Sequence, residues 1–174
     1  MRRRITTIVA LIIAAVSTAS SQEVQPLKQL HNVELLDLKG KPAVLPKWGE
    51  KNLLIFYIDP DRASQNQDFT DELERSKRAE SENIFGFGVI NLKDAPFVPN
   101  GLARMMADKR TRKNGATVLA DQRGTLYTEW ELGDCNNMFI VMMVNRAGEL
   151  VFIRKGLMDD DDKAAFFVAL ETIK

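Results

Sequence analysis

The most reactive group in the sequence is one thiol without a partner. Cys135 is the only cysteine among 174 residues, so no disulfide can form within the chain. Thiol–disulfide exchange needs an attacking thiolate and usually a second thiol that releases the mixed disulfide. Three interpretations remain: an inert buried side chain, a disulfide that links two chains into a dimer, or a reactive thiol. The first is favoured, because free cysteines are among the most often buried residues.

Two polar side chains, those of Asp61 and Ser64, lie between an apolar run and a charged segment. Residues 52–58 are mostly apolar and bounded by turn residues, which is typical of a strand buried on both faces. Asp61 and Ser64 come next, and Ser64 with Gln67 has capping-box spacing. We expect Asp61 and Ser64 to accept hydrogen bonds from free N–H groups where the following helix begins.

Carboxylates and thioethers raise the question of a metal site. The four aspartates of residues 159–162 are consecutive, so they spread around a helix start and lack the ligand spacing of a calcium loop. They suit the positive end of a helix dipole instead. Met142 and Met143 point to opposite faces of a strand, so they do not converge on copper(I). With His31 the only histidine and no glycine-rich nucleotide loop, we predict no metal and no cofactor.

The N-terminus has the pattern of an export signal. Three arginines precede an apolar run of about a dozen residues, and small residues follow, which indicates a signal peptide at residues 1–21. The run is shorter than the roughly 20 residues that a membrane-spanning helix needs. We therefore expect a periplasmic protein with no stable membrane insertion after cleavage. Residues 22–32 are expected to form an N-terminal extension and residues 33–174 one domain.

The charge balance argues against nucleic acid as a partner. The chain has 24 basic and 24 acidic residues, and removal of three arginines leaves 21 against 24, a net charge of about −3. Such a balance creates no field that attracts nucleic acid. The short basic run at residues 109–113 is interpreted as the solvated end of a helix.

Hydrophobic patterning predicts an α/β domain. Expected strands lie at residues 52–58, 84–90 and 116–120, with hairpins at 33–45 and 139–154 and helices at 65–80, 102–113 and from 159 onward. The third strand turns at residues 121–124 into residues 125–131. Alternating strands and helices indicate a central mixed sheet flanked by helices, and Pro42 places one hairpin strand at a sheet edge.

Three segments resemble the thioredoxin-like families of exported bacterial proteins that open with an extra hairpin. They are DLKGK at residues 37–41, LLIFY at 53–57 and VNRAGELV at 144–151. The resemblance implies a thioredoxin-like fold with an extra N-terminal β-hairpin. Redox members carry Cys-x-x-Cys after the first buried strand and a cis-proline before the strand that enters the final hairpin. The residues of this chain at the dithiol position are Asp61, Arg62, Ala63 and Ser64, and residues 136–139 contain no proline.

A closer resemblance is to the YtfJ-type family of exported proteins, whose members also lack the dithiol. It rests on VINLKDA at residues 89–95 with the proline-containing loop that follows, and on ADQRG at 120–124 followed by WEL at 130–132. This resemblance implies the fold and an envelope location, without an established reaction.

These observations favour a redox-inactive thioredoxin-like protein that is not a dithiol–disulfide oxidoreductase. We expect a noncatalytic binding or adaptor protein that uses residues 61–64 to hold an envelope protein or a small molecule. One alternative is a single-cysteine thiol enzyme or redox sensor that uses Cys135. A second alternative is a regulator of gene expression, against which export and the acidic balance both argue.

Overall fold

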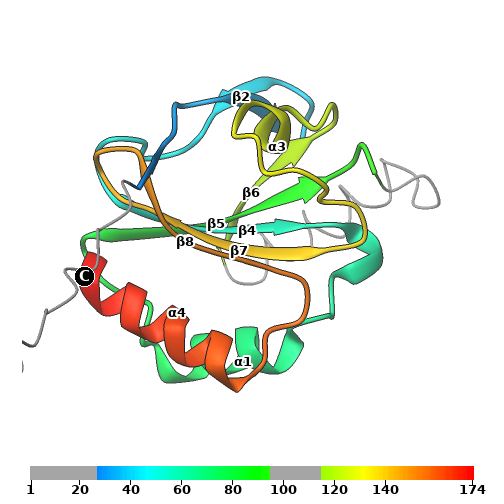
Figure 1. The fold of residues 1–174 in the computed structure, drawn as a ribbon. Coiled ribbons are helices and arrows are strands. Elements are labelled where there is room, and N and C mark those ends of the chain that lie inside the picture. Colours follow the sequence, from blue (N-terminus) through cyan, green and yellow to red (C-terminus); the bar gives the residue numbers. More distant parts are fainter. Residues whose placement is uncertain (1–26, 95–114) are drawn as a thin grey trace, which may run out of the picture.

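The computed structural model describes residues 27–94 and 115–174. Their strands form one mixed sheet in the order β1-β8-β7-β4-β5-β6-β2-β3 (Figure 1). The strands are β1 (Lys28–Gln29), β2 (Glu34–Asp37), β3 (Pro42–Val44), β4 (Asn52–Ile58), β5 (Ile84–Asn91), β6 (Thr117–Asp121), β7 (Phe139–Val144) and β8 (Glu149–Lys155). The helices are the 3-10 turn η1 (Pro60–Arg62), α1 (Gln67–Ser76), α3 (Thr125–Glu129) and α4 (Asp160–Ile173). The predicted α/β class and the mixed sheet are confirmed.

Strand β4 is the centre of the sheet. It runs parallel to β5 and antiparallel to β7, and it begins and ends at the predicted residues. Its side chains alternate between the two faces, so Ile55 packs on the α3 side whereas Leu54 packs on the side of α1 and α4. Both faces are covered, which explains why the sequence of this strand is a nearly continuous apolar run.

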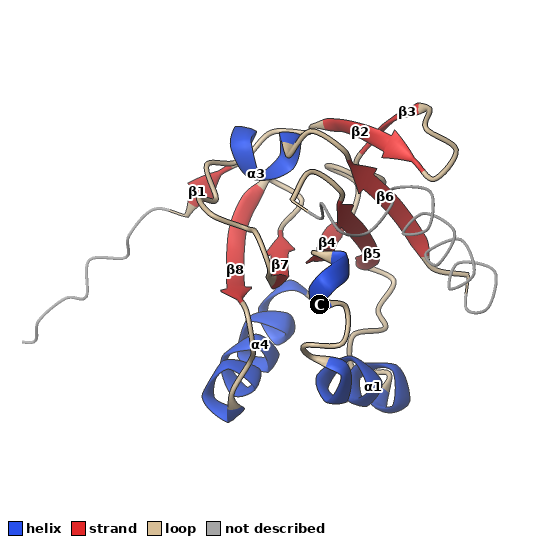
Figure 2. Ribbon diagram, turned by 90° about the vertical axis from the view of Figure 1, so that its right-hand side faces the viewer, coloured by secondary structure: helices blue, strands red, loops and turns tan. Residues whose placement is uncertain are grey.

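Helices α1 and α4 lie side by side under one face, and α3 lies on the other (Figures 1 and 2). Phe69 of α1 and Phe166 of α4 meet edge to face, with ring centroids 4.9 Å apart. Phe166 also contacts Phe152 of β8 at 5.7 Å, so one aromatic cluster joins both helices to the sheet. Aromatic pairs in this geometry contribute beyond the area they bury.

Both predicted hairpins are present. In the first, β2 and β3 pair with Leu35 opposite Ala43, and β3 is an outer strand of the sheet, as Pro42 predicted. In the second, β7 and β8 are joined by a turn that contains Gly148 at φ 81°. A Cβ at Gly148 would lie 3.1 Å from the backbone oxygen of Leu30, so this turn requires glycine on two grounds.

Three features differ from expectation or extend it. Helix α1 is shorter than the expected 65–80, and residues 125–129 form the helix α3, which the pattern did not assign. Strand β1 pairs with β8 and Leu30 is buried, so part of the expected extension lies in the sheet. The expected signal peptide at 1–21 and the expected helix at 102–113 lie outside the described residues. Among the helices described, none has the length and apolar character to cross a membrane.

Candidate functional site

Strands β4, β5 and β6 are parallel and therefore end at the same border of the sheet, onto which Figure 2 looks. In open α/β sheets, ligands bind outside the carboxyl ends of such strands. Two loops meet at the end of β4, namely residues 59–66 and residues 134–138, and together we call them the η1 edge. The positions of the absent dithiol lie here.

A buried carboxylate joins the two loops of the η1 edge. Asp59 is fully buried, and its side chain accepts hydrogen bonds from the backbone N–H of Asp61 and of Asn137, both at 2.9 Å. The N–H of Asp59 donates to the carbonyl oxygen of Met138 at 3.0 Å. Burial raises the pKa of Asp59, although these two N–H donors oppose the shift. Asp59 therefore fixes η1 against the loop before β7.

The expectation that Asp61 and Ser64 cap a helix is wrong. Asp59 caps η1, because Pro60 turns the chain so that the N–H of Asp61 faces the Asp59 carboxylate. Two further turns follow before α1 begins at Gln67, so Ser64 lies two residues before the N-cap position of α1. The N-cap position belongs to Asn66, whose side chain makes no capping hydrogen bond.

The side chain of Asn66 links the η1 edge to the loop between β8 and α4 instead. Its side chain is buried, donates to the carbonyl oxygen of Gly156 at 2.9 Å and accepts from the N–H of Met158 at 3.0 Å. Next to it, Gln65 accepts a hydrogen bond from the N–H of Phe139 at 3.0 Å. These three bonds position the chain that follows residues 61–64.

The four residues at the dithiol position form a polar surface turn. Asp61, Arg62 and Ser64 are exposed and Ala63 is half-buried, and Asn136 and Asn137 are exposed on the neighbouring loop. None of them supplies a thiol, and residues 61–64 all precede α1. The arrangement can donate and accept hydrogen bonds on an exposed surface, but it cannot transfer electrons to a disulfide.

Cys135 belongs to the second loop of the η1 edge, but its side chain points inward. Its side chain is buried, and its Sγ lies 3.5 Å from the carbonyl oxygen of Gly133. Burial raises the pKa of the Cys135 thiol to about 11, although nearby Lys155 opposes the shift. The Nζ of Lys155 donates to the carbonyl oxygens of Leu132 and of Asp134, the latter at 2.9 Å, and so holds the loop closed over the sulfur.

The sequence pattern pointed to Asp61 and Ser64, whereas the structure shows that their neighbours Asp59 and Asn66 organise the site. A signal for Asp59 was available, because Asp followed by Pro is a common start of a helical turn, with Asp as N-cap and Pro in the first position. No local signal marks Asn66, since both of its partners are about 90 residues away in the chain.

The same arrangement of strands and helices occurs in solved thiol-disulfide oxidoreductases and peroxiredoxin-like proteins. A thiol-disulfide oxidoreductase from Bacteroides fragilis matches with a TM-score of 0.58 and 12% identity, over 84% of this chain and 100% of its own. Peroxidoxin BcpB from Mycobacterium tuberculosis matches with 0.56 and 15%, over 85% and 97%. The exposed lipoprotein thioredoxin of Streptococcus pneumoniae matches with 0.51 and 17%, over 82% and 99%.

At these identities the likeness shows the fold, which is thioredoxin-like. No family model matches the sequence, and no curated protein does.

Proposed function

We propose that this thioredoxin-like chain is a noncatalytic binding protein that holds a segment of another protein at the η1 edge. The observation that carries the proposal is the replacement of the dithiol by an exposed polar turn that buried Asp59 fixes against the loop before β7. A rigid scaffold that presents exposed loops is the usual basis of a binding site.

The exposed groups at the η1 edge suit a hydrogen-bonded partner. Arg62 offers a cation with several donors, Asp61 and Ser64 offer oxygens, and the amides of Asn136 and Asn137 offer both donors and acceptors. The partner we favour is an extended polar protein segment, because the groups lie on two adjacent loops and none of the five is a large apolar side chain.

The single-cysteine alternative has less support. A thiol nucleophile has to be ionised and accessible, and Cys135 is buried with a raised pKa. The burial of the sulfur also argues against a disulfide-linked dimer, since the loop over Cys135 would first have to open. A redox sensor would need that opening as an additional step.

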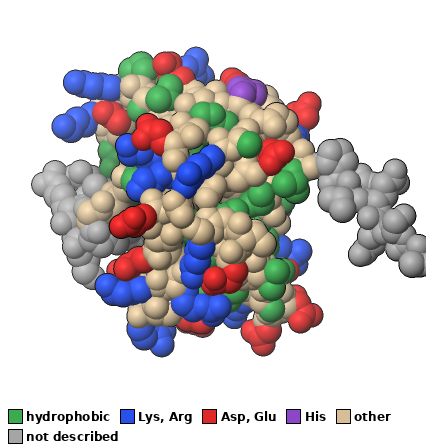
Figure 3. Space-filling view, turned by 90° about the vertical axis from the view of Figure 1, so that its left-hand side faces the viewer, with side chains coloured by type: hydrophobic (Ala, Val, Ile, Leu, Met, Phe, Trp, Pro, Cys, Tyr) green, Lys and Arg blue, Asp and Glu red, His purple; other side chains and the backbone are tan. Residues whose placement is uncertain are grey.

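Charge supports a protein partner over nucleic acid. On the face shown in Figure 3, basic and acidic side chains are interspersed instead of forming a basic patch. The acidic balance expected after export, about −3, gives no overall attraction to phosphate. Gene regulation is accordingly the least supported of the three functions.

A place among the YtfJ-type exported proteins, and a periplasmic location, are part of this proposal. Residues 89–95, 120–124 and 130–132 support the first, and the pattern of residues 1–21 supports the second. Fractionation of the native protein, with mass determination of its N-terminus, tests export directly. Recovery of the full-length chain in the cytoplasm contradicts it.

The binding function is tested by capture from an envelope extract. The wild type is compared with a double variant of the η1 edge, Arg62→Ala with Ser64→Ala, and with a matched control, Lys39→Ala with Thr128→Ala. The control removes one cation and one hydroxyl from exposed positions elsewhere. We expect a partner whose recovery falls at least about tenfold in the η1-edge variant, because a hydrogen bond to a charged group is lost.

Recovery that is equal in the wild type, the η1-edge variant and the control contradicts the proposal. An insulin-reduction or peroxidase assay provides a second test. Turnover above that of a control without the protein would show that the protein is a catalyst and would contradict a noncatalytic binding function.

A further inference from the structure

Most of the outer border of β8 is left unpaired. Strand β1 pairs with β8 only at Glu149 and Leu150, and Figure 2 shows that β1 covers one end of β8 while the rest of β8 forms the border of the sheet. Among residues 27–94 and 115–174, no strand lies beside residues 151–155 on that side. The hydrogen-bonding groups of this stretch therefore decide what the border can bind.

The groups that point outward follow from the pairing of β8 with β7. The N–H of Gly156 donates to the carbonyl oxygen of Phe139 at 2.9 Å. Along an antiparallel pair, residues that bond to the neighbouring strand alternate with residues that do not, so every second residue of β8 counted back from Gly156 faces β7. The N–H and C=O groups of Ile153 and Lys155 therefore face away from the sheet.

This border lacks the features that protect sheet edges in natural proteins. Free edges are usually blunted by a proline, a bulge or a free charged side chain. Residues 151–155 contain no proline, and their pairing with β7 is regular from Phe152 to Lys155. The opposite border of the sheet, by contrast, carries Pro42 in β3. An unprotected edge of this kind indicates a surface that another strand covers.

Both cations of the border are engaged within the chain. The Nε of Arg154 lies 2.7 Å from the Oδ2 of Asp162 on α4, and the Nζ of Lys155 donates to two backbone carbonyl oxygens. Between them, Ile153 is 36% exposed. The border therefore presents unpaired backbone and an apolar side chain instead of free charges.

The open border has the same length as the strand segment that forms it. Strand β1 bounds it at Leu150, and the chain leaves the sheet at Gly156, which has φ 83°. A second copy of the chain that runs antiparallel along the border brings the same residues 151–155, so both copies pair over their whole open length. This match in length favours a second copy as the occupant.

The charges of the border are compatible with this pairing. With the two Ile153 residues opposite each other, Lys155 of one copy lies opposite Val151 of the other, and Arg154 lies opposite Phe152. Like charges directly opposite each other destabilise a strand pair, and this register has none.

We propose that two copies of this chain associate through the borders of β8, with a two-fold axis at Ile153. The N–H of each Ile153 donates to the C=O of the other, which makes one continuous sheet from two. Because both copies use the same surface, the assembly closes at a dimer. The interface is a single strand pair, so the dimer is weak and exchanges with the monomer. The proposal does not involve residues 61–64 and is independent of the proposed partner at the η1 edge.

The dimer is tested by sedimentation of the native protein over a series of concentrations. We expect a reversible monomer–dimer equilibrium. Ile153→Lys places two like charges directly opposite each other and should raise the dissociation constant at least about tenfold. Val44→Lys is the matched control, because Val44 is an apolar side chain, 58% exposed, on the opposite border, and this variant should leave the equilibrium unchanged.

A charge reversal separates pairing at Ile153 from damage to the fold. Ile153→Glu alone should also dissociate the dimer, for the same reason as Ile153→Lys. An equal mixture of the two variants should recover association, because opposite charges then face each other across the two-fold axis.

Three outcomes overturn the proposal. The first is a protein that sediments as a monomer at every concentration. The second is a dimer that Ile153→Lys does not weaken, since another surface would then hold it. The third is slow hydrogen exchange of the Ile153 amide in the monomer, because the border would then be covered from within the same chain.

The two proposals fail independently. The η1-edge variant, Arg62→Ala with Ser64→Ala, should leave self-association unchanged, and Ile153→Lys should leave partner capture at the η1 edge unchanged.

Discussion

Asp59 is the residue on which the candidate site depends. Its carboxylate is buried and accepts two backbone N–H donors from loops that are far apart in the sequence. In a redox thioredoxin-like protein the corresponding border of the sheet carries a reactive dithiol. Here the same border carries a carboxylate turned inward, which supports the proposal that its surface binds a partner.

The raised pKa of Asp59 predicts a pH dependence of stability. Because the folded pKa lies above the ordinary value of 3.8, the folded state holds this proton more tightly than the unfolded chain does. The stabilisation that the protonated Asp59 side chain gives to the folded state is therefore fully present below about pH 3.8, and it is lost as the pH rises through the pKa of the folded state. We expect the free energy of unfolding of the wild type, relative to Asp59→Asn, to fall over that window.

Urea unfolding at a series of acidic to neutral pH values measures this difference. Asp68→Asn, at an exposed position in the first turn of α1, measures the general effect of losing one carboxylate. If the free energy of unfolding of the wild type instead rises with pH relative to that of Asp59→Asn, the pKa of Asp59 in the folded state is lowered and not raised.

The thiol of Cys135 should be inert in the folded protein. A rise of the thiol pKa from 9.0 to about 11 reduces the thiolate fraction near neutral pH by about 100-fold, and burial restricts access further. We expect alkylation by iodoacetamide, followed by mass spectrometry, to be at least about 100-fold slower in the folded chain than in urea. Equal rates in the two states would reopen the thiol-enzyme hypothesis.

At the level of helices and strands, predictions from the sequence agreed with the structure where the pattern that indicates an element lies within that element or next to it. Strand β4 was placed at its true ends because an apolar run bounded by turn residues contains all the information needed. The acidic run at residues 159–162 was also interpreted correctly as the start of a helix, which is α4. The structure adds a reciprocal capping box between Asp159 and Asp162.

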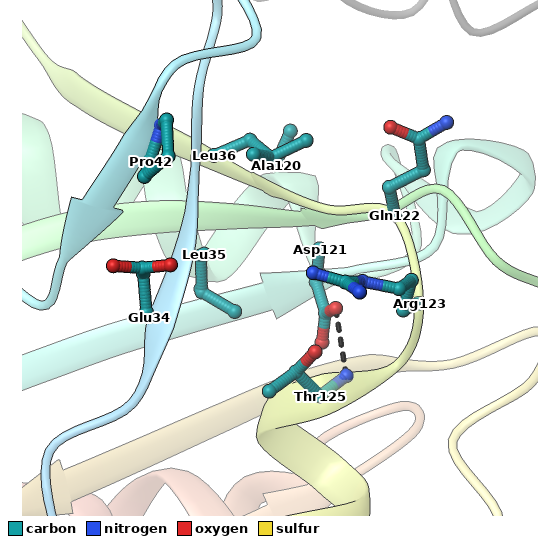
Figure 4. A pocket seen from close by; sticks show the side chains of 9 residues that line it. All are labelled: Glu34, Leu35, Leu36, Pro42, Ala120, Asp121, Gln122, Arg123 and Thr125. Atoms are coloured by element: carbon teal, nitrogen blue, oxygen red, sulfur yellow. Dashed lines mark hydrogen bonds between the residues drawn. The ribbon is translucent and has the colours of Figure 1, made fainter.

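Signals that depend on distant partners were misread. Helix α1 follows Asn66, whose side chain bonds to the loop after β8 and not to its own helix. Helix α3 was not assigned because it spans only residues 125–129 and is anchored by Asp121, by Leu126 in the core and by Trp130 just after it. The cavity lined by Glu34, Leu35 and Thr125 (Figure 4) lies where β2 and β6 are no longer paired, and no periodicity within one segment predicts such a gap.

The aromatic cluster between α1 and α4 provides a test of helix packing. Phe166 is fully buried, whereas Val168, two residues further along α4, is 69% exposed. We expect Phe166→Ala to lower the free energy of unfolding by about 3–5 kcal/mol, because it leaves a cavity among Phe69 and Phe152. Val168→Ala is the control and should change it by less than about 0.5 kcal/mol. Similar losses in the two variants would contradict the packing described.

At the scale of the whole molecule, the sheet couples two separate hydrophobic clusters. Both tryptophans, Trp48 and Trp130, pack on the α3 side, whereas α1 and α4 pack on the opposite side. The alternating side chains of β4 enter both clusters. Unfolding of one cluster would therefore displace β4 and disrupt the other cluster as well.

We therefore expect tryptophan fluorescence and far-UV circular dichroism to report one coincident unfolding transition in urea. Phe166→Ala should move both transitions to lower urea by the same amount, although the substitution lies on the face away from the tryptophans. A shift in the dichroism alone would mean that the two layers melt independently.

The outer position of β3 has a consequence for how these molecules meet one another. Pro42 has no N–H to offer, the strand spans only residues 42–44, and a turn with Lys39 and Lys41 adjoins it. A neighbouring chain that approached this border would find an interrupted row of donors and positive charges beside it. The border thus discourages edge-to-edge association of copies into fibrils.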